Sequence, residues 1–140
     1  MGIEPFLVSS SLECLVAQRL VRLICPKCKI PAKNKNEVLL ELKGLVSDLK
    51  TLEIFEGKGC ETCRFTGYLG RTGIHEILIM TEQIREMILQ RASSQQIKQK
   101  AIAEQGMRTL RQDGLKKVIA GLTTYSEVVR VTQQEELPEE

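Results

Sequence analysis

Aromatic residues are scarce in this chain of 140 residues: there is no tryptophan, and there are two tyrosines and three phenylalanines. Proteins that bind single-stranded nucleic acid stack its bases on aromatic side chains, so this scarcity argues against such a role. The net charge of +2 gives no strong attraction to nucleic acid or anionic lipid either. No stretch approaches the ~20 apolar residues that span a bilayer, and the start has no signal-peptide pattern, so we expect neither a membrane span nor export.

The motifs of common catalytic sites are also missing. His75 is the only histidine, which excludes sites built from several histidines. The phosphate-binding loop GxxxxGK[ST] and the dinucleotide-binding motif GxGxxG are both absent. If the protein hydrolyses a nucleotide, the part that binds the phosphates lies outside this chain. We therefore assign no catalytic residue and expect no enzymatic activity from the chain by itself.

Hydrophobic spacing predicts an α+β chain that is mainly helical. Leu12, Val16 and Leu20 recur every four residues and predict a helix over residues 4–24, with Pro5 in its first turn. The three serines at 9–11 are weak helix formers and allow a break there. Cys14 lies inside this predicted helix, where we expect it to be a small buried core residue.

The rest of the chain divides into short elements. We expect a helix over residues 37–43 that ends at Gly44, a short strand near 52–55, turns over 65–73 and a strand over 74–80. Three or more helices follow. Thr81 is a cap for the first of them, and Ser93-x-x-Gln96 is a capping box for the second, which should end at Gly106. An apolar run over 110–122 predicts the third, and Thr124-x-x-Glu127 is a second capping box after it. The acidic end, residues 133–140, should fray.

Two pairs of cysteines carry the strongest chemical signal. They are Cys25-x-x-Cys28 and Cys60-x-x-Cys63. Two intervening residues let a tight turn direct both sulfurs of a pair at one ion, and two such turns complete a tetrahedral shell that suits Zn²⁺. With no export signal, a reducing compartment is expected, where paired cysteines bind metal more often than they form disulfides. An all-cysteine shell predicts a closed, structural site without an open catalytic position.

Several alternatives stay open at this point. The same four sulfurs suit iron, and the two pairs can also be read as redox motifs or as buried thiols without a metal. We read His75 as a surface or hydrogen-bonded strand residue, not as a ligand. Between Glu13 and Glu37 the chain has several basic residues and no acidic one: Arg19, Arg22, Lys27, Lys29, Lys33 and Lys35. We interpret this basic run either as a solvated face or as a contact to an acidic partner or a nucleotide phosphate.

Several longer segments, taken with the cysteine pairs, resemble a known family. They are MGIEPFLVSSSL (1–12), AQRLVR (17–22), TGYLGRTGIHE (66–76) and GMRTLRQDG (106–114). In this order they resemble the C-terminal part of the traffic ATPases of type II secretion and type IV pilus assembly, over residues 1–132. The four zinc cysteines of that family match Cys25, Cys28, Cys60 and Cys63 one by one, and the details of the motifs are more similar to the secretion branch.

The resemblance implies an architecture. Residues 1–24 would be the last helical piece of a RecA-like ATPase core, 25–73 a tetracysteine zinc subdomain, 74–132 a C-terminal strand and helical bundle, and 133–140 an acidic tail. It also implies that the phosphate-binding Walker A and Walker B motifs precede this segment in a longer parent protein. ATP and Mg²⁺ would then bind only in that parent, and Zn²⁺ would be the cofactor of this segment.

The resemblance further implies a function. The parent would form a hexameric ring in the cytoplasm, peripheral to the inner membrane, and its ATP hydrolysis would power assembly of a pseudopilus or a pilus. Its partners would be neighbouring subunits and the secretion platform proteins of the inner membrane, with no nucleic acid. Two other classes of function compete with this reading, namely a free-standing zinc-ribbon module that binds nucleic acid and a redox-sensing thiol protein.

Overall fold

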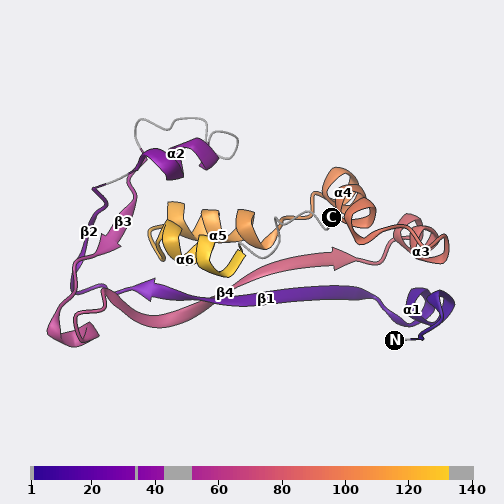
Figure 1. Cartoon of the computed structure of the whole chain (residues 1–140), viewed down its shortest axis with the longest axis horizontal. Coiled ribbons are helices and arrows are strands. Elements are labelled where there is room, and N and C mark those ends of the chain that lie inside the picture. Colours follow the sequence, from indigo (N-terminus) through magenta and orange to yellow (C-terminus); the bar gives the residue numbers. More distant parts are fainter. Residues whose placement is uncertain (1, 34, 43–51, 133–140) are drawn as a thin grey trace. The chain divides into compact units, whose positions relative to one another are not determined.

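The computed structural model describes residues 2–33, 35–42 and 52–132, and it is α+β as the sequence predicts (Figure 1). The elements in chain order are α1 (Pro5–Ser11), β1 (Cys14–Ile24), β2 (Lys29–Pro31), α2 (Asn36–Leu42), β3 (Phe55–Gly57), the 3₁₀ helix η1 (Glu61–Cys63), β4 (Tyr68–Ile79), α3 (Glu82–Leu89), α4 (Ser94–Gln105), α5 (Leu110–Ile119) and α6 (Tyr125–Thr132). None of the helices in these ranges is long and apolar enough to cross a bilayer.

The described strands form two small sheets. Strands β1 and β4 pair in one sheet, and their arrows point in opposite directions in Figure 1. Strands β2 and β3 pair antiparallel in the other sheet, with Lys29 opposite Gly57 and Pro31 opposite Phe55. The chain divides into two compact units, residues 1–18 with 75–109 and residues 19–74 with 110–140.

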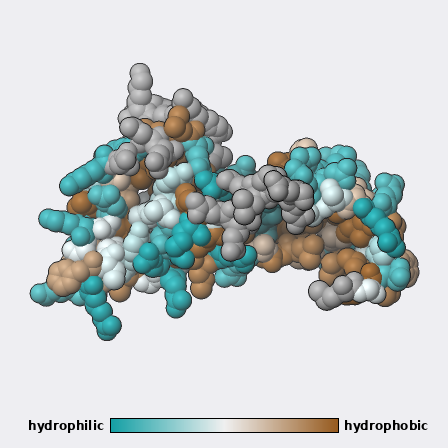
Figure 2. Space-filling view, in the orientation of Figure 1, coloured by the Kyte–Doolittle hydropathy of each residue, from teal (hydrophilic) through white to brown (hydrophobic). Residues whose placement is uncertain are grey.

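The first unit has a small core between β4 and its helices. Met80, Ile84, Ala101 and Met107 are buried there, and Leu12 packs against them. The guanidinium of Arg85 on α3 donates to the backbone carbonyl of Ser9, which ties α3 to α1. The surface over α1 is hydrophobic (Figure 2), and its exposed residues are Ile3, Phe6 and Leu7.

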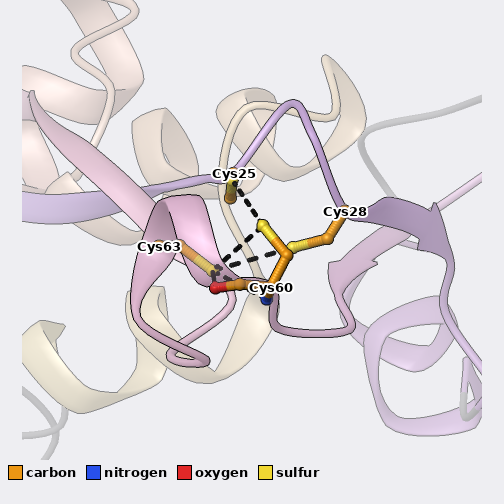
Figure 3. Close-up of side chains that lie close together, drawn as sticks. All are labelled: Cys25, Cys28, Cys60 and Cys63. Carbon is orange, nitrogen blue, oxygen red and sulfur yellow. Dashed lines mark hydrogen bonds between the residues drawn. The ribbon is translucent and has the colours of Figure 1, made fainter.

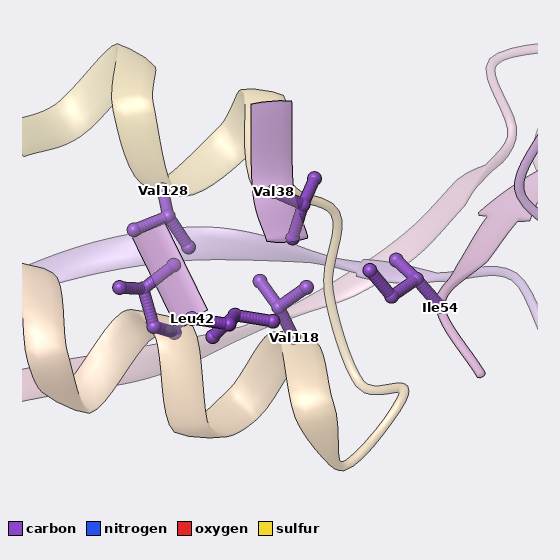
Figure 4. Close-up of a cluster of buried hydrophobic side chains, with 6 residues drawn as sticks. Val38, Leu42, Ile54, Val118 and Val128 are labelled. Atoms are coloured by element: carbon purple, nitrogen blue, oxygen red, sulfur yellow. The ribbon is translucent and has the colours of Figure 1, made fainter. Parts of the chain in front are cut away.

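The second unit has its main core between α2, α5 and α6 (Figure 4). Its buried side chains are Val38, Leu42, Ile54, Leu115, Val118 and Val128. Full burial of each such side chain contributes roughly 1.5–3 kcal/mol relative to exposure. A smaller cluster joins Val21 of β1, Ile74 of β4 and Leu110 of α5, so the paired strands and α5 share buried surface.

Polar contacts attach α2 to the two C-terminal helices. The guanidinium of Arg111 on α5 donates to the carboxylate of Glu41 on α2 through two nitrogens. The hydroxyl of Tyr125 on α6 donates to the same carboxylate at 2.5 Å. Hydrogen bonding from Arg111 holds the pKa of Glu41 below its ordinary value, so this carboxylate stays charged and α2 stays tied to α5 and α6 near neutral pH.

The predicted helix over residues 4–24 is wrong beyond Ser11. The helix ends where the hydroxyls of Ser9 and Ser10 donate to the carbonyl of Phe6 at 3.0 and 2.9 Å, and residues 14–24 form strand β1. An apolar residue at every fourth position also fits a strand. Side chains on one face of a strand recur every two residues, so residues four apart share a face. The cause lies outside the local sequence, since β1 pairs with β4, more than 40 residues further along.

Two further expectations need correction. Cys14 is exposed on β1 and is not a buried core residue. The glycine-rich stretch 65–73 forms turns only as far as Gly67, because β4 begins at Tyr68 and carries the later glycines within a strand. The strand expected near 52–55 begins at Phe55, and Gly44 and the tail 133–140 lie outside the described residues.

The helix signals of the C-terminal part are confirmed at most positions. The hydroxyl of Thr81 accepts from the backbone N–H of Ile84, and Ser93 and Gln96 form the predicted capping box. Gly106 ends α4 with a left-handed φ of 62°. Thr124 caps α6 by accepting from the N–H of Glu127 at 3.3 Å, but the Glu127 carboxylate does not reach back to complete a box and instead binds arginines.

Close packing of α5 on α6 depends on Gly114. A Cβ at this position would lie 2.6 Å from Cγ1 of Val128, a fully buried residue of α6. We therefore expect Gly114→Val to lower the free energy of unfolding by about 1–3 kcal/mol, the usual effect of overpacking a core. Denaturant titration measures it, with Gly2→Val as the control because nothing lies within 4 Å of a Cβ there.

A second substitution tests the cause of that loss. Adding Val128→Ala to Gly114→Val removes the methyl groups that clash, so the double variant should be more stable than the sum of the two single losses predicts. Strictly additive losses would contradict the proposed contact between these two side chains.

Candidate metal centre

The structure brings the four predicted cysteines together. The sulfur atoms of Cys25, Cys28, Cys60 and Cys63 all lie within 4.8 Å of one another, and this is the one such His, Cys, Asp or Glu group found among the described residues (Figure 3). The separations are 3.9 Å for Cys25–Cys60 and for Cys28–Cys63, and 3.7 Å for Cys60–Cys63. Cys14 is not part of this cluster.

These separations suit a tetrahedral metal. A tetrahedral ion with sulfur ligands at about 2.3 Å places neighbouring sulfurs about 3.8 Å apart. Four cysteine side chains offer soft sulfur donors, which favour zinc or iron over hard cations such as Mg²⁺. The four thiols can therefore hold one metal ion such as zinc with little movement.

Each cysteine pair sits on a short turn closed by the backbone. The N–H of Cys28 donates to the carbonyl of Cys25 at 3.3 Å, just after the end of β1. The N–H of Cys63 donates to the carbonyl of Cys60 at 3.2 Å, across η1. Further backbone bonds join the segments next to these turns. The N–H of Lys58 donates to the carbonyl of Cys28 at 3.0 Å, and the N–H of Cys25 donates to the carbonyl of Gly67, the residue before β4, at 2.9 Å.

Backbone N–H groups also point at two of the sulfurs. Cys63 Sγ accepts from the N–H of Cys60 at 3.2 Å and from that of Gly67 at 3.3 Å. Cys28 Sγ accepts from the N–H of Gly59 at 3.3 Å. Hydrogen bonds of this kind stabilise a thiolate, the form of cysteine that binds metal.

These N–H groups also act on the pKa values of the two thiols. Burial by itself would raise the pKa of Cys63, but the N–H groups of Cys60 and Gly67 outweigh it and bring the pKa to about 6. Burial raises the pKa of Cys28 to about 12, with only one backbone N–H acting in the other direction. Of these two thiols, Cys63 is therefore the better prepared to bind a metal as a thiolate.

Two glycines permit this arrangement by letting their backbones meet. A Cβ on Gly57 would lie 2.0 Å from the carbonyl oxygen of Gly67, and a Cβ on Gly67 would lie 2.5 Å from that of Gly57. Gly67 also has a left-handed φ of 79°, which other residues rarely adopt. The sequence shows both glycines, but it gives no sign that they face each other.

The turn after the second cysteine pair has an unusual backbone. Arg64 and Phe65 are consecutive non-glycine residues with left-handed φ values of 52° and 61°. Their conformation is held by backbone bonds, from Arg64 N–H to Glu61 at 3.0 Å and from Phe65 N–H to Cys60 at 2.8 Å. The Phe65 side chain gains no burial in return, since it is 73% exposed.

The other residues singled out in the sequence lie elsewhere. His75 is half-buried on β4 and is not a member of the cysteine cluster. Two cations of the basic run are engaged within the fold, because Lys29 lies 4.2 Å from the ring centre of Phe55 and Arg22 pairs with Glu127. Sequence reasoning missed the backbone donors Gly59 and Gly67, for which the only signal was the abundance of glycine near the cysteines.

The contact between Gly57 and Gly67 leads to a prediction about metal affinity. A methyl group at position 57 would clash with the Cα and carbonyl of Gly67 and push away the backbone of this residue, whose N–H donates to Cys63 Sγ. We expect Gly57→Ala to weaken Zn²⁺ binding by about 10–100-fold, as changes beside metal ligands typically do. Competition with a chromophoric chelator measures it.

Gly106→Ala is the matched control for that experiment. Gly106 also has a positive φ, of 62°, but it lies in the first unit and ends α4. Its variant should lose stability without a change in Zn²⁺ affinity. Unaltered affinity in Gly57→Ala would show that the Gly67 N–H is unimportant for the site.

Comparison with known proteins identifies relatives of the chain. A family model described as Type II/IV secretion system protein matches residues 1–130. The type IV pilus assembly ATPase PilB of Myxococcus xanthus is 44% identical over 130 residues, which cover 92% of this chain and 23% of that protein. Type II secretion system protein E of Dickeya dadantii is 44% identical over 135 residues, or 96% of this chain and 26% of that protein.

A third relative is PilB of Thermus thermophilus, 42% identical over 132 residues, which are 94% of this chain and 15% of that protein. The chain therefore spans about a quarter or less of the length of these relatives. Since the family model covers residues 1–130 of the 140, the chain belongs to the family of type II and type IV secretion system proteins.

Proposed function

We propose that this chain is the C-terminal, zinc-containing segment of a hexameric P-loop ATPase that powers type II protein secretion by assembling a pseudopilus. The observation that carries the proposal is the family match over residues 1–130 together with the four-sulfur cluster. The ATP-binding motifs would lie in another part of the parent protein, so the chain alone would be inactive. The parent would act in the cytoplasm, peripheral to the inner membrane, with neighbouring subunits and the platform proteins as partners.

The same segment of a type IV pilus assembly ATPase is the alternative. The two kinds of relative are equally similar, at 44% identity for one of each. Our preference for secretion rests on the segments GRTGIHE (70–76) and MRTLRQDG (107–114), which we read as resembling that branch. Both branches would use the same metal site and the same ring.

Within the segment, we propose a structural role for Zn²⁺ held by Cys25, Cys28, Cys60 and Cys63. Four sulfurs would fill a tetrahedral shell and leave no open position for a substrate. The site would link the end of β1 to the turn before β4, and its binding free energy would add directly to the folding free energy of the second unit.

We further propose that residues 1–24 complete a RecA-like core, that 25–73 form the zinc subdomain and that 74–132 form the C-terminal strand and helical bundle. Support for the first part comes from apolar residues that β1 leaves exposed, with Leu15 at 44%, Val16 at 57% and Leu20 at 47%. Side chains alternate along a strand, so Val16 and Leu20 share one face of β1 and Leu15 lies on the other. Exposed apolar residues of this kind favour surfaces that another part of the parent covers.

A chimeric protein tests the function and separates the two branches. Residues 1–132 would replace the matching segment of secretion protein E from Dickeya dadantii and, in parallel, of PilB from Myxococcus xanthus. We expect the first chimera to restore protein export to a strain lacking protein E, and the second to restore pilus assembly less well. The same chimeras carrying Cys60→Ser are controls, and failure of both intact chimeras would overturn the proposal.

The metal assignment gives a second prediction. Elemental analysis of the purified chain should find about one zinc per chain, and Cys14→Ser should keep it because Cys14 lies outside the cluster. Cys60→Ser should lose most of the metal. Amide hydrogen exchange should then become faster in residues 25–73 and stay unchanged in α3 and α4. Zinc loss in Cys14→Ser with retention in Cys60→Ser would contradict the assignment.

The exposed strand gives a third prediction. Changing Val16 and Leu20 to Asp should reduce self-association of the isolated chain, because both are about half exposed and apolar. In the parent protein the same double change should impair ATP hydrolysis and secretion, because it would place charge against the core. Leu12 is not a suitable position, since it packs inside the first unit. Normal secretion by the altered parent would refute the proposed contact.

A further inference from the structure

A buried carboxylate in the second unit joins two arginines. Glu127 of α6 is only 2% exposed. Its Oε1 accepts from Nη2 of Arg22 at 2.6 Å and from Nε of Arg130 at 3.1 Å. Its Oε2 accepts from Nη2 of Arg130 at 2.9 Å and from the backbone N–H of Arg22 at 3.1 Å. One carboxylate therefore fixes both guanidiniums.

Neither arginine is buried with its partner. The side chain of Arg22 is 47% exposed and that of Arg130 is 56% exposed. The guanidinium carbon of Arg22 lies 4.2 Å from the ring centre of Tyr68, which restricts it from a second side. The Tyr68 hydroxyl is itself held by Thr124 at 2.8 Å. The two cations are thus oriented by the fold while half of their surface faces outward.

The charges do not cancel. Burial would raise the pKa of Glu127, but hydrogen bonds from Arg22 and Arg130 outweigh it and bring the pKa to about 2, so the group is ionised near neutral pH. Two positive charges then face one negative charge. Hydrogen bonding to Glu127 raises the pKa of Arg130, and the positive charge of Arg22 acts against it, as expected for like charges held together.

Several donors of the pair are still available. Among the described residues, Nε and Nη1 of Arg22 and Nη1 of Arg130 take part in no hydrogen bond. A link between β1 and α6 needs only one arginine to balance Glu127. The second guanidinium adds repulsion to that link, but it also supplies a second planar set of N–H donors. Such forked donors match the oxygens of carboxylate and phosphate groups.

We propose that Arg22 and Arg130, held by Glu127, form a binding site for an oxyanionic group, phosphate or carboxylate, carried by a molecule outside this chain. The bound anion supplies a second negative charge, which balances the second arginine. Its oxygens accept hydrogen bonds from the guanidinium N–H groups that Glu127 does not use. Because Glu127 and Tyr68 already fix the arginines, binding loses little side-chain entropy. The inference does not depend on the proposed function, since it concerns these four side chains alone.

Titration of the purified chain with pyrophosphate at about 0.15 M salt tests the site, since this ionic strength screens diffuse surface charge. We expect saturable binding that shifts the Nε–H NMR signals of Arg22 and Arg130. Arg130→Gln should weaken the affinity for pyrophosphate by about tenfold or more, because it removes one charged hydrogen-bonding group. Arg130→Lys should keep the charge yet bind more weakly, because an ammonium lacks the planar fork.

Controls separate the site from general electrostatics and from unfolding. Arg108→Gln removes one exposed cation from the first unit and should leave pyrophosphate binding unchanged. Glutarate, titrated in parallel, separates a carboxylate ligand from a phosphate ligand by its relative affinity. No saturable shift at Arg22 and Arg130 with either probe in the unaltered chain would overturn the inference, as would equal losses in Arg108→Gln and Arg130→Gln. The NMR result on the unaltered chain stands even if a variant unfolds.

Discussion

The second unit depends on the meeting of two cysteine turns that lie far apart in the sequence. Backbone bonds between Lys58 and Cys28 and between Cys25 and Gly67 place the turns before any metal is considered. The glycine backbones at 57 and 67 approach more closely than any side chain would allow. Val21 of β1 and Ile74 of β4 then pack against Leu110 of α5. The strands that hold the cysteine turns therefore also contact a helix of the core.

The candidate site was predictable because its signal is local. Each cysteine pair has the spacing of a metal-binding turn, and the structure needs only to bring two such turns together. The C-terminal helices were predictable for a similar reason, since Thr81, Ser93 and Gly106 act on backbone groups within a few residues of themselves. Zinc itself is still a prediction.

The errors arose where distant contacts decide the structure. Leu12, Val16 and Leu20 share a helical spacing, yet residues 14–24 form a strand because β4 supplies its hydrogen bonds. Glu127 fits the sequence of a capping box, but a buried carboxylate gains more from two arginines than from one N–H. Arg130 lies only three residues from Glu127, but Arg22 precedes it by 105 residues, far outside the window that a sequence pattern can read.

The left-handed pair Arg64–Phe65 depends on the same cysteine turn. Such backbone conformations cost about 1–3 kcal/mol each and persist only while surrounding structure holds them. Here the support comes from the turn that carries Cys60 and Cys63. Because Arg64 directly follows Cys63, a metal bound at that thiol would also limit the freedom of this strained backbone.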